Sequence, residues 1–83
     1  MNQAIQFPDQ ESWDEQRQAV CFPALVNGVI LTCAISREGL CRHYGSDAAP
    51  LSLFNAHRWD IEEQAERLIA QQQEDDQGWV WLS

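Results

Sequence analysis

The stretch AVCFPALVNGVILTCAIS, residues 19–36, decides the fold. Two apolar runs flank Asn27-Gly28, a dipeptide that readily takes the two positive φ angles of a type I′ turn, so the stretch predicts a β-hairpin. The two-residue loop also sets the register, which pairs Val26 with Val29 and Phe22 with Cys33. Because strand side chains alternate, one face of this hairpin is entirely apolar. It consists of Val20, Phe22, Ala24, Val26, Val29, Leu31, Cys33 and Ile35, and it must form the floor of the core.

Pro23 lies within the first strand of the hairpin, which we expect to run from about Arg17 to Val26. Residues 23 and 32 form a non-hydrogen-bonded pair in this register, so the N–H that Pro23 lacks would point away from the second strand. The outer side of the first strand should therefore pair imperfectly near Pro23, as an edge or at a bulge.

The residues before the hairpin predict one further strand. Ala4–Phe7 reads as a short strand that Pro8-Asp9 ends. Residues 9–16 are polar apart from Trp13, and we expect a connection, with at most one helical turn, that this indole anchors.

After the hairpin the pattern becomes helical. Ser36 is placed to cap a short helix over Arg37–Tyr44, which Gly45 ends. A loop over Gly45–Ala49 leads to Pro50, which suits the first turn of a second helix reaching about Gln73. The apolar stripe of that helix is about 100° wide, and it consists of Leu51, Phe54, Ile61, Ala65, Leu68 and Ile69.

The chain closes with an acidic turn over residues 74–78 and a final strand, Trp79–Leu82. Both faces of that strand are apolar, so either it lies inside the sheet or its Trp face is exposed and used. Residues 1–83 then form a single domain. The expected fold is a two-layer α+β domain: a four-stranded, mainly antiparallel sheet with two helices packed on one face, in the chain order β-β-β-α-α-β.

The charge of the chain is strongly negative. Thirteen Asp and Glu face five Arg, with no Lys, for a formal net charge of -8. Binding to nucleic acid or to an anionic membrane depends on clustered cations, so both are disfavoured. Simple solubility or a basic protein partner fits this composition better.

Neither a membrane span nor a signal peptide is visible in the sequence, so we expect a cytoplasmic protein. The three cysteines agree with a reducing compartment. The hairpin register places Cys33 on the buried face and Cys21 on the opposite one, so these two thiols are not positioned to form a disulfide.

Several segments together resemble a known family, the YrdB-like family of small proteobacterial proteins, which is classed as a domain of unknown function. The resemblance rests on Ile5-Gln6-Phe7-Pro8, Val20–Gly28, Cys33-Ala34-Ile35-Ser36 with Glu38 and Leu40, His57-Arg58-Trp59-Asp60, and Glu74–Leu82. It implies a small α+β domain with helices packed on an antiparallel sheet. It implies no activity, because the family supplies no catalytic or binding residues to carry over.

Metal-binding or nucleophilic chemistry finds little support in the sequence. Cys41 and His43 are the closest pair of ligand types, but on a helix they lie about 200° apart and cannot share an ion. Cys21 has no basic residue near it in the sequence that would lower its pKa. The acidic residues cluster on a helix face and in a turn, where solvation explains them. We therefore expect no enzyme activity, no metal and no cofactor.

Arg58 is unusual because it falls within the apolar stripe of the long helix, where an unpaired guanidinium would be costly to bury. One interpretation is an ion pair that orients the helix, with Glu62 one turn away and the sheet or the Asp75-Asp76 turn as a further source of partners. The alternative is a ligand pocket in which His57 and Arg58, with Trp59, bind an anionic or aromatic molecule.

The tryptophans suggest an interaction surface. Trp59 falls off the apolar stripe on the side of Glu63 and Glu66, and Trp is enriched in binding hot spots. With Trp79 and Trp81 it would form one aromatic patch rimmed by acids; the alternative is that these indoles seal the core.

Three functions follow as hypotheses. The first is a non-enzymatic protein–protein interaction module that presents this acidic, Trp-rich surface to a partner, which is expected to be basic. The second is a small-molecule binding domain with its pocket near His57 and Arg58. The third is a homo-oligomer, for example a homodimer formed through the outer face of the sheet.

Overall fold

The hairpin has the register that the Asn-Gly turn predicts. The computed structural model describes residues 5–82, in which β3 (Ala19–Val26) and β4 (Val29–Ser36) pair antiparallel. Val26 lies opposite Val29 and Phe22 opposite Cys33. Asn27 and Gly28 take φ values of 52° and 83°, as a type I′ turn requires. The apolar face of the hairpin is therefore confirmed as the floor of the core, except for Val29 beside the turn, which is 59% exposed.

Two short strands share the outer edge of β3. β1 (Ile5–Gln6) pairs with Leu25 and Val26, and β2 (Ser12–Asp14) pairs with residues 19–21, both antiparallel. The outer ladder is interrupted between these two stretches, at the position of Pro23. The predicted imperfect pairing near Pro23 is confirmed, and the missing N–H faces the gap between the two short strands.

The strand β2 was missed by sequence reasoning, which expected only a connection over residues 9–16. Its three residues are too few to show an alternating pattern. Trp13 packs against the core from this strand, so its predicted role as an anchor is confirmed. Of the first predicted strand, Ala4 lies outside the described residues.

The final strand β5 (Trp79–Leu82) lies beside β4 and runs parallel to it. The sheet order is β1-β3-β4-β5, with β2 also on β3. The described residues thus form a five-stranded sheet with one parallel pair, where four strands were expected. The two-layer α+β class and the mainly antiparallel sheet are as predicted.

The first helix, α1 (Arg37–Tyr44), begins and ends where the sequence predicts. The Ser36 hydroxyl accepts a hydrogen bond from the Gly39 N–H at 2.9 Å, which satisfies one of the free donors of the first turn. Gly45, with φ of 86°, follows its last residue.

The predicted long helix from Pro50 is two helices. α2 (Pro50–Ala56) and α3 (Arg58–Ala70) are separated by His57, whose φ and ψ of -120° and 27° are not helical. The expected single helix to about Gln73 is therefore wrong. The apolar spacing hides the break, because Phe54 and Ile61 are seven residues apart, which is two full turns of an uninterrupted helix.

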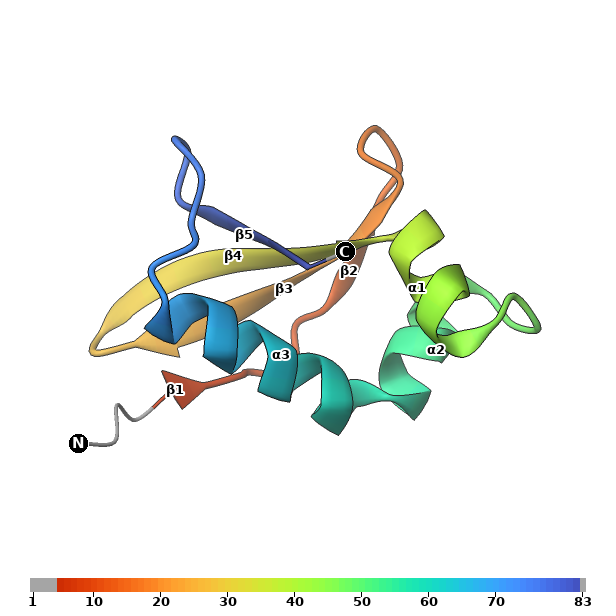
Figure 1. Ribbon diagram of the computed structural model, residues 1–83, viewed down its shortest axis with the longest axis horizontal. Helices are drawn as coiled ribbons and strands as arrows, with labels where there is room; N and C mark the ends of the chain where they lie inside the picture. Colours follow the sequence, from red (N-terminus) through yellow and green to blue (C-terminus); the bar gives the residue numbers. More distant parts are fainter. Residues whose placement is uncertain (1–4, 83) are drawn as a thin grey trace.

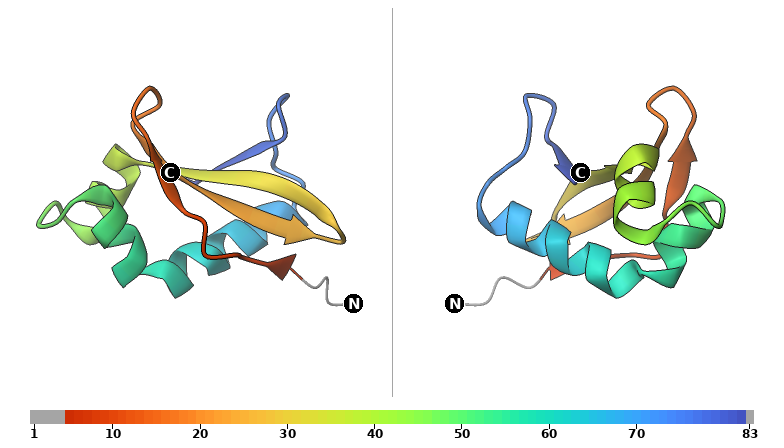
Figure 2. Two further views of the ribbon diagram at one scale, coloured as in Figure 1. Left: turned by 180° about the vertical axis from the view of Figure 1, so that it is seen from behind. Right: turned by 45° about the vertical axis from the view of Figure 1, so that its right-hand side comes forward.

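All three helices lie on one side of the sheet (Figure 1), with α3 along the sheet and α1 and α2 at one end. Phe54 of α2 packs on Phe22 of β3, with ring centroids 4.9 Å apart. Ile61, Ala65 and Ile69 of α3 are buried with them. The two views in Figure 2 show no helix over the opposite, outer face of the sheet, above which the turns at 15–18 and 74–78 rise.

Candidate functional site

Arg58 is held by acidic side chains from two segments. Its Nε donates to Glu62 and its Nη1 to Glu11, both at 2.7 Å. Its Nη2 lies 2.9 Å from Asp9 and donates to the Pro8 carbonyl at 3.2 Å. Glu62 is the partner expected from the helix, whereas the other partners come from the N-terminal segment and not from the Asp75-Asp76 turn.

This cluster sets the charge state of its members. The Arg58 side chain is only 17% exposed. Burial alone would lower the pKa of Arg58, but the hydrogen bonds that the guanidinium donates to Glu11 and Glu62 outweigh burial and raise the pKa. The hydrogen bond from Arg58 holds the pKa of Glu11 below its ordinary value. The surroundings of Arg58 in the fold are thus those of the ion-pair interpretation.

The predicted ligand pocket is a shallow hollow of about 420 Å³ formed by residues 55–60, with His57 and Arg58 in its lining. The imidazole of His57 stacks on Tyr44, with ring centroids 4.1 Å apart and planes at 10°. Burial, together with the hydrogen bond that the hydroxyl donates to Asp60, raises the pKa of Tyr44 to about 12. Since the guanidinium of Arg58 is engaged by its carboxylate partners, this hollow does not offer it to an anionic ligand.

Trp59 projects from the first turn of α3 and is 87% exposed. It borders a hollow of about 400 Å³ whose apolar wall is Ile5 and Phe7 and whose acidic wall includes Glu63 and Glu66. We call these five residues the Trp59 face. Sequence reasoning grouped Trp59 with Glu63 and Glu66, and the structure brings these three together.

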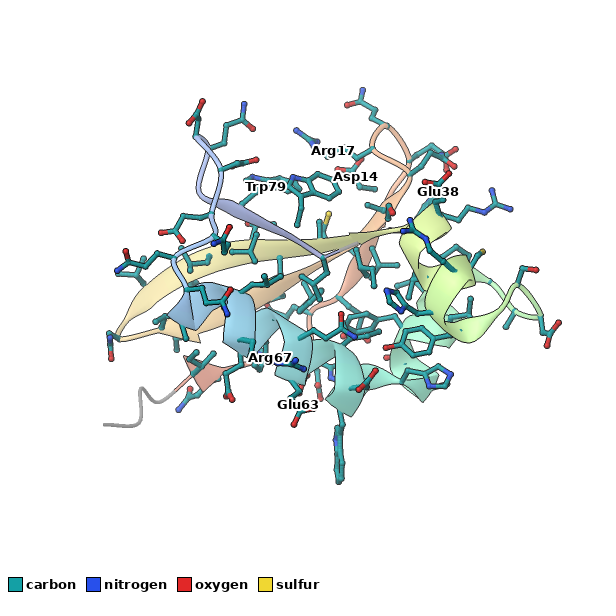
Figure 3. The ribbon with its side chains drawn as sticks, viewed as in Figure 1. Asp14, Arg17, Glu38, Glu63, Arg67 and Trp79 are labelled. Atoms are coloured by element: carbon teal, nitrogen blue, oxygen red, sulfur yellow. The ribbon has the colours of Figure 1, made fainter. Side chains whose placement is uncertain are left out.

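Trp79 and Trp81 lie elsewhere, on the outer face of the sheet. Val80 and Leu82 between and after them are buried, so alternation directs both indoles away from the helices. Figure 3 shows Trp79 above the sheet and Glu63 on the far side of α3. The expected single patch of three indoles is therefore wrong: the helical layer and the sheet separate Trp59 from the other two.

The two outer indoles are packed by local contacts. Their ring centroids are 5.8 Å apart, and the Arg17 guanidinium carbon lies 4.5 Å from the centroid of Trp79. Arg17 also forms an ion pair with Asp14 at 3.0 Å, so the turn between β2 and β3 reaches over β5. Trp81 remains 40% exposed. The outer sheet face thus has an aromatic corner whose charge is locally balanced.

The acidic turn before β5 is an ordered cap on this edge strand. The Asp75 carboxylate accepts hydrogen bonds from the N–H groups of Trp79 and Gln77, each at 2.9 Å. The Asp75 N–H donates in return to the Trp79 carbonyl at 2.7 Å. These backbone hydrogen bonds, that of Trp79 foremost, lower the pKa of Asp75. Its carboxylate therefore has a structural role at the start of β5.

The cysteines and the other ligand-type residues do not gather. Cys33 is buried, and burial raises the pKa of its thiol to about 12. Within residues 5–82, no three His, Cys, Asp or Glu side chains lie close enough to hold a metal ion. The same part of the chain contains no helix with the length and apolar character needed to span a bilayer.

Sequence reasoning missed the pairing of Arg58 with Asp9 and Glu11. These acids lie almost fifty residues before Arg58, so no helical or strand period connects them. The one signal in the sequence was the position of a cation in an apolar stripe. It indicated that Arg58 needs an acidic partner, but not which residue that partner is.

The fold and these surfaces define a small α+β domain with a mixed five-stranded sheet and an exposed acidic, aromatic helix face. The family described as "Protein of unknown function (DUF1488)" matches residues 5–82, and the chain belongs to this family.

Relatives along the full chain agree with this assignment. The chain is 63% identical to the uncharacterised protein YrdB of Escherichia coli (strain K12) and 62% identical to that of Shigella flexneri, each over 99% of both chains. The crystal structure of a DUF1488 family protein of unknown function from Shewanella loihica PV-4 superimposes with a TM-score of 0.92 at 40% identity, covering 99% of this chain and 94% of that one. The fold is that of the family, and the names of these relatives assign no activity.

Proposed function

We propose that this protein is a non-enzymatic interaction module that binds basic segments of a partner protein through the Trp59 face. The observation that carries the proposal is the position of Trp59. An indole that is 87% exposed contributes little to folding where it stands, yet it lies beside apolar and acidic side chains in one hollow. Large exposed aromatic side chains of this kind are typical of binding hot spots.

The chemistry of the face selects a cationic side chain. An Arg or Lys stem can pack on Ile5, Phe7 and the indole, while its charged end reaches Glu63 or Glu66. Glu63 approaches Arg67 only to 4.0 Å, with both side chains about 70% exposed, so this pair opposes a competing cation weakly. The face can therefore combine a cation–π contact with ion pairs to one partner residue.

The charge of the whole chain supports the same class of partner. A formal net charge of -8 favours the approach of a basic segment and speeds association at low ionic strength. We also propose a cytoplasmic location, because unpaired cysteines such as Cys21, Cys33 and Cys41 are typical of a reducing compartment.

The test is a binding titration with a fluorescein-labelled peptide of alternating arginine and glycine, followed by anisotropy. We expect saturable binding that weakens as salt is raised, because exposed ion pairs are screened. The variants Trp59→Ala and Glu63→Gln/Glu66→Gln should each weaken binding by at least about fivefold.

A matched control separates the face from the net charge. Glu74→Gln/Asp76→Asn also removes two charges, but from the exposed acidic turn next to β5. This variant should change the affinity by less than about twofold. Equal weakening by both double variants, or full affinity in Trp59→Ala, would show that the peptide responds only to the overall charge and would refute the proposal.

A further inference from the structure

The outer face of the sheet is largely apolar, and none of the helices within residues 5–82 covers it (Figure 2). An antiparallel sheet with one covered face usually turns polar side chains to the solvent on the other. In β3 and β4 the side chains that alternate with the buried core side chains lie on the outer side, and none of them is charged. They are Ala19, Cys21, Pro23, Leu25, Ile30, Thr32, Ala34 and Ser36. An apolar surface of this kind indicates an interaction site.

The register of the strands gathers the exposed part of this face into one patch. Trp79 lies opposite Thr32, which lies opposite Pro23. The next outward pair toward the hairpin turn is Ile30 and Leu25, and Ile30 is 68% exposed. We call this set, together with the second indole of β5, the outer patch. It consists of Pro23, Leu25, Ile30, Thr32, Trp79 and Trp81.

The outer patch has an ordered aromatic wall and a small hollow. The indoles of Trp79 and Trp81 stack on each other, and the Trp81 indole donates a hydrogen bond to the Asp75 carboxylate. Across the sheet, a hollow of about 210 Å³ lies at the gap between β1 and β2. Its volume is below the roughly 300 Å³ at which small-molecule sites begin, but it can take one side chain of a partner. Its lining is uncharged and consists of Gln10, Ser12, Cys21, Phe22, Pro23 and Thr32.

The hydrogen bonds at the sheet edges favour a helix over a strand as the bound segment. The outer edge of β3 is occupied by β1 and β2, and Pro23 between them has no N–H. On the free side of β5, Asp75 already binds both the carbonyl and the N–H of Trp79. A segment that lies on the apolar face must therefore satisfy its own backbone N–H and C=O groups. A helix does so internally.

The charge of the two turns that rise above the outer face selects a basic helix. Residues 15–18 and 74–78 together contain four Asp and Glu and one arginine. That residue, Arg17, already places its guanidinium carbon 4.5 Å from the ring centroid of Trp79, and Figure 3 shows the two side chains together above the sheet. A cation of a partner can make the same kind of contact with the indoles and reach the carboxylates of the turns.

We propose that the outer patch binds a basic amphipathic helix of a partner protein. The apolar side of that helix packs on Leu25, Ile30 and Trp79, and one of its side chains enters the hollow beside Pro23. Lys or Arg on its flanks reach the two acidic turns. The bound helix forms a third layer on the sheet. Because the sheet and the helical layer separate the outer patch from the Trp59 face, this proposal does not depend on the proposed function.

The test uses a fluorescein-labelled helical peptide of about 15 residues, with Leu at i, i+3, i+4 and i+7, Lys beside this stripe and Ala elsewhere. Anisotropy measures its binding, and we expect a dissociation constant on the order of 10 μM. A second peptide has the same composition, but its Leu residues are spread around the helix. This peptide keeps the charge without the apolar stripe, so it should bind at least about tenfold more weakly.

Variants of the protein locate the bound peptide. Leu25→Thr/Ile30→Thr removes two apolar side chains but keeps residue types that favour strands, and it should weaken binding by at least about fivefold. The single variant Ile30→Thr, at an exposed position, should weaken binding in the same direction and does not depend on the folding of the double variant. Trp59→Ala is the matched control, because it removes an exposed apolar side chain from the other side of the molecule. It should change the affinity by less than about twofold.

Charge variants distinguish this surface from the Trp59 face. Glu74→Gln/Asp76→Asn, in the exposed turn before β5, should weaken binding of the helical peptide by at least about threefold. Glu63→Gln/Glu66→Gln should change it by less than about twofold. This order is the reverse of the one expected for the arginine–glycine peptide, which has no apolar side chains to place on the outer patch.

Three results would overturn the proposal. The first is equal binding of the two helical peptides, which would show that charge alone attracts them. The second is a set of ¹H–¹⁵N shifts centred on the indole of Trp59 instead of the amide of Thr32 and the indole of Trp79. The third is dimerisation of the protein in sedimentation experiments that Ile30→Thr abolishes, because a second copy of the chain would then occupy the outer patch.

Discussion

The guanidinium of Arg58 lies 2.7 Å from the carboxylate of Glu11, a residue 47 positions earlier in the chain. This contact fastens the segment that joins β1 and β2 to the first turn of α3. Three carboxylates surround the one cation, two of them largely shielded from solvent. Without Arg58 these carboxylates would repel one another in a partly buried environment, so the guanidinium is needed to stabilise their charged forms.

Replacing Arg58 by methionine should therefore destabilise the fold. Met keeps much of the apolar stem but leaves Glu11 and Glu62 without their cation. Breaking one side of a buried pair costs several kcal/mol, and with partial solvent exposure we expect about 2 kcal/mol. Urea unfolding measures the difference. Arg42→Met, which breaks an exposed pair, should lower the free energy of unfolding by less than about 0.5 kcal/mol. Equal losses in the two variants would show that the burial of the Arg58 ion pairs does not add to stability.

The same contact predicts how stability depends on pH. Arg58 lowers the pKa of Glu11 in the folded state below its ordinary value of 4.5. A carboxyl group of this kind stabilises the fold at pH values above its pKa in the unfolded chain. This contribution is lost as the pH falls through its pKa in the folded protein. Glu11→Gln should therefore be less stable than the natural chain at neutral pH, and the gap should narrow below pH 4.5. Melting temperatures of both proteins across this pH range test the prediction. A difference in melting temperature that does not change with pH would contradict it.

The end of α3 predicts a stabilising substitution. Gln72 has a φ of 56°, and the N–H groups of Gln72 and Gln73 donate to the carbonyls of Ile69 and Leu68. These are the hydrogen bonds of a Schellman motif, whose left-handed position usually holds glycine. Gln72→Gly should raise the free energy of unfolding by about 0.5–1 kcal/mol. Ala70→Gly, at the last helical residue of α3, should lower the free energy of unfolding, because glycine is the poorer helix former. A change of the same sign in both variants would contradict this explanation.

Two aromatic residues on adjoining helices should separate folding from binding. Phe54 is fully buried against Phe22, so Phe54→Ala should cost about 3–5 kcal/mol. Trp59→Ala should change the stability by no more than about 0.5 kcal/mol, because the indole is exposed. Chemical unfolding of both variants provides the measurement. A large loss in Trp59→Ala would mean that the indole supports the fold, which would remove the main argument for the Trp59 face.

Local chemistry explains what the sequence could predict. Asn27-Gly28 sets the hairpin register, and Ser36 and Gly45 set the ends of α1, because each acts within a few residues of its own position. Alternation likewise predicts that Trp79 and Trp81 share one face of β5 and that Val80 and Leu82 share the other. For the same reason the interruption at Pro23 was predictable, as was the short strand at Ile5–Gln6, whereas β2 was not.

The errors arise where tertiary contacts decide. The break at His57 has no proline or glycine to mark it, and the apolar period continues through it. The imidazole lies instead on the ring of Tyr44, a contact between two helices that no local pattern contains. The division of the three tryptophans has the same origin, since it depends on which side of the sheet the helices cover.

The position of β5 has a consequence for how the chain is made. Val80 and Leu82 are buried beside a strand that precedes all three helices, so the interior cannot close until the last strand is free of the ribosome. Until then the apolar face of the nascent hairpin stays uncovered. A stall late in translation would therefore leave the chain in its most aggregation-prone state.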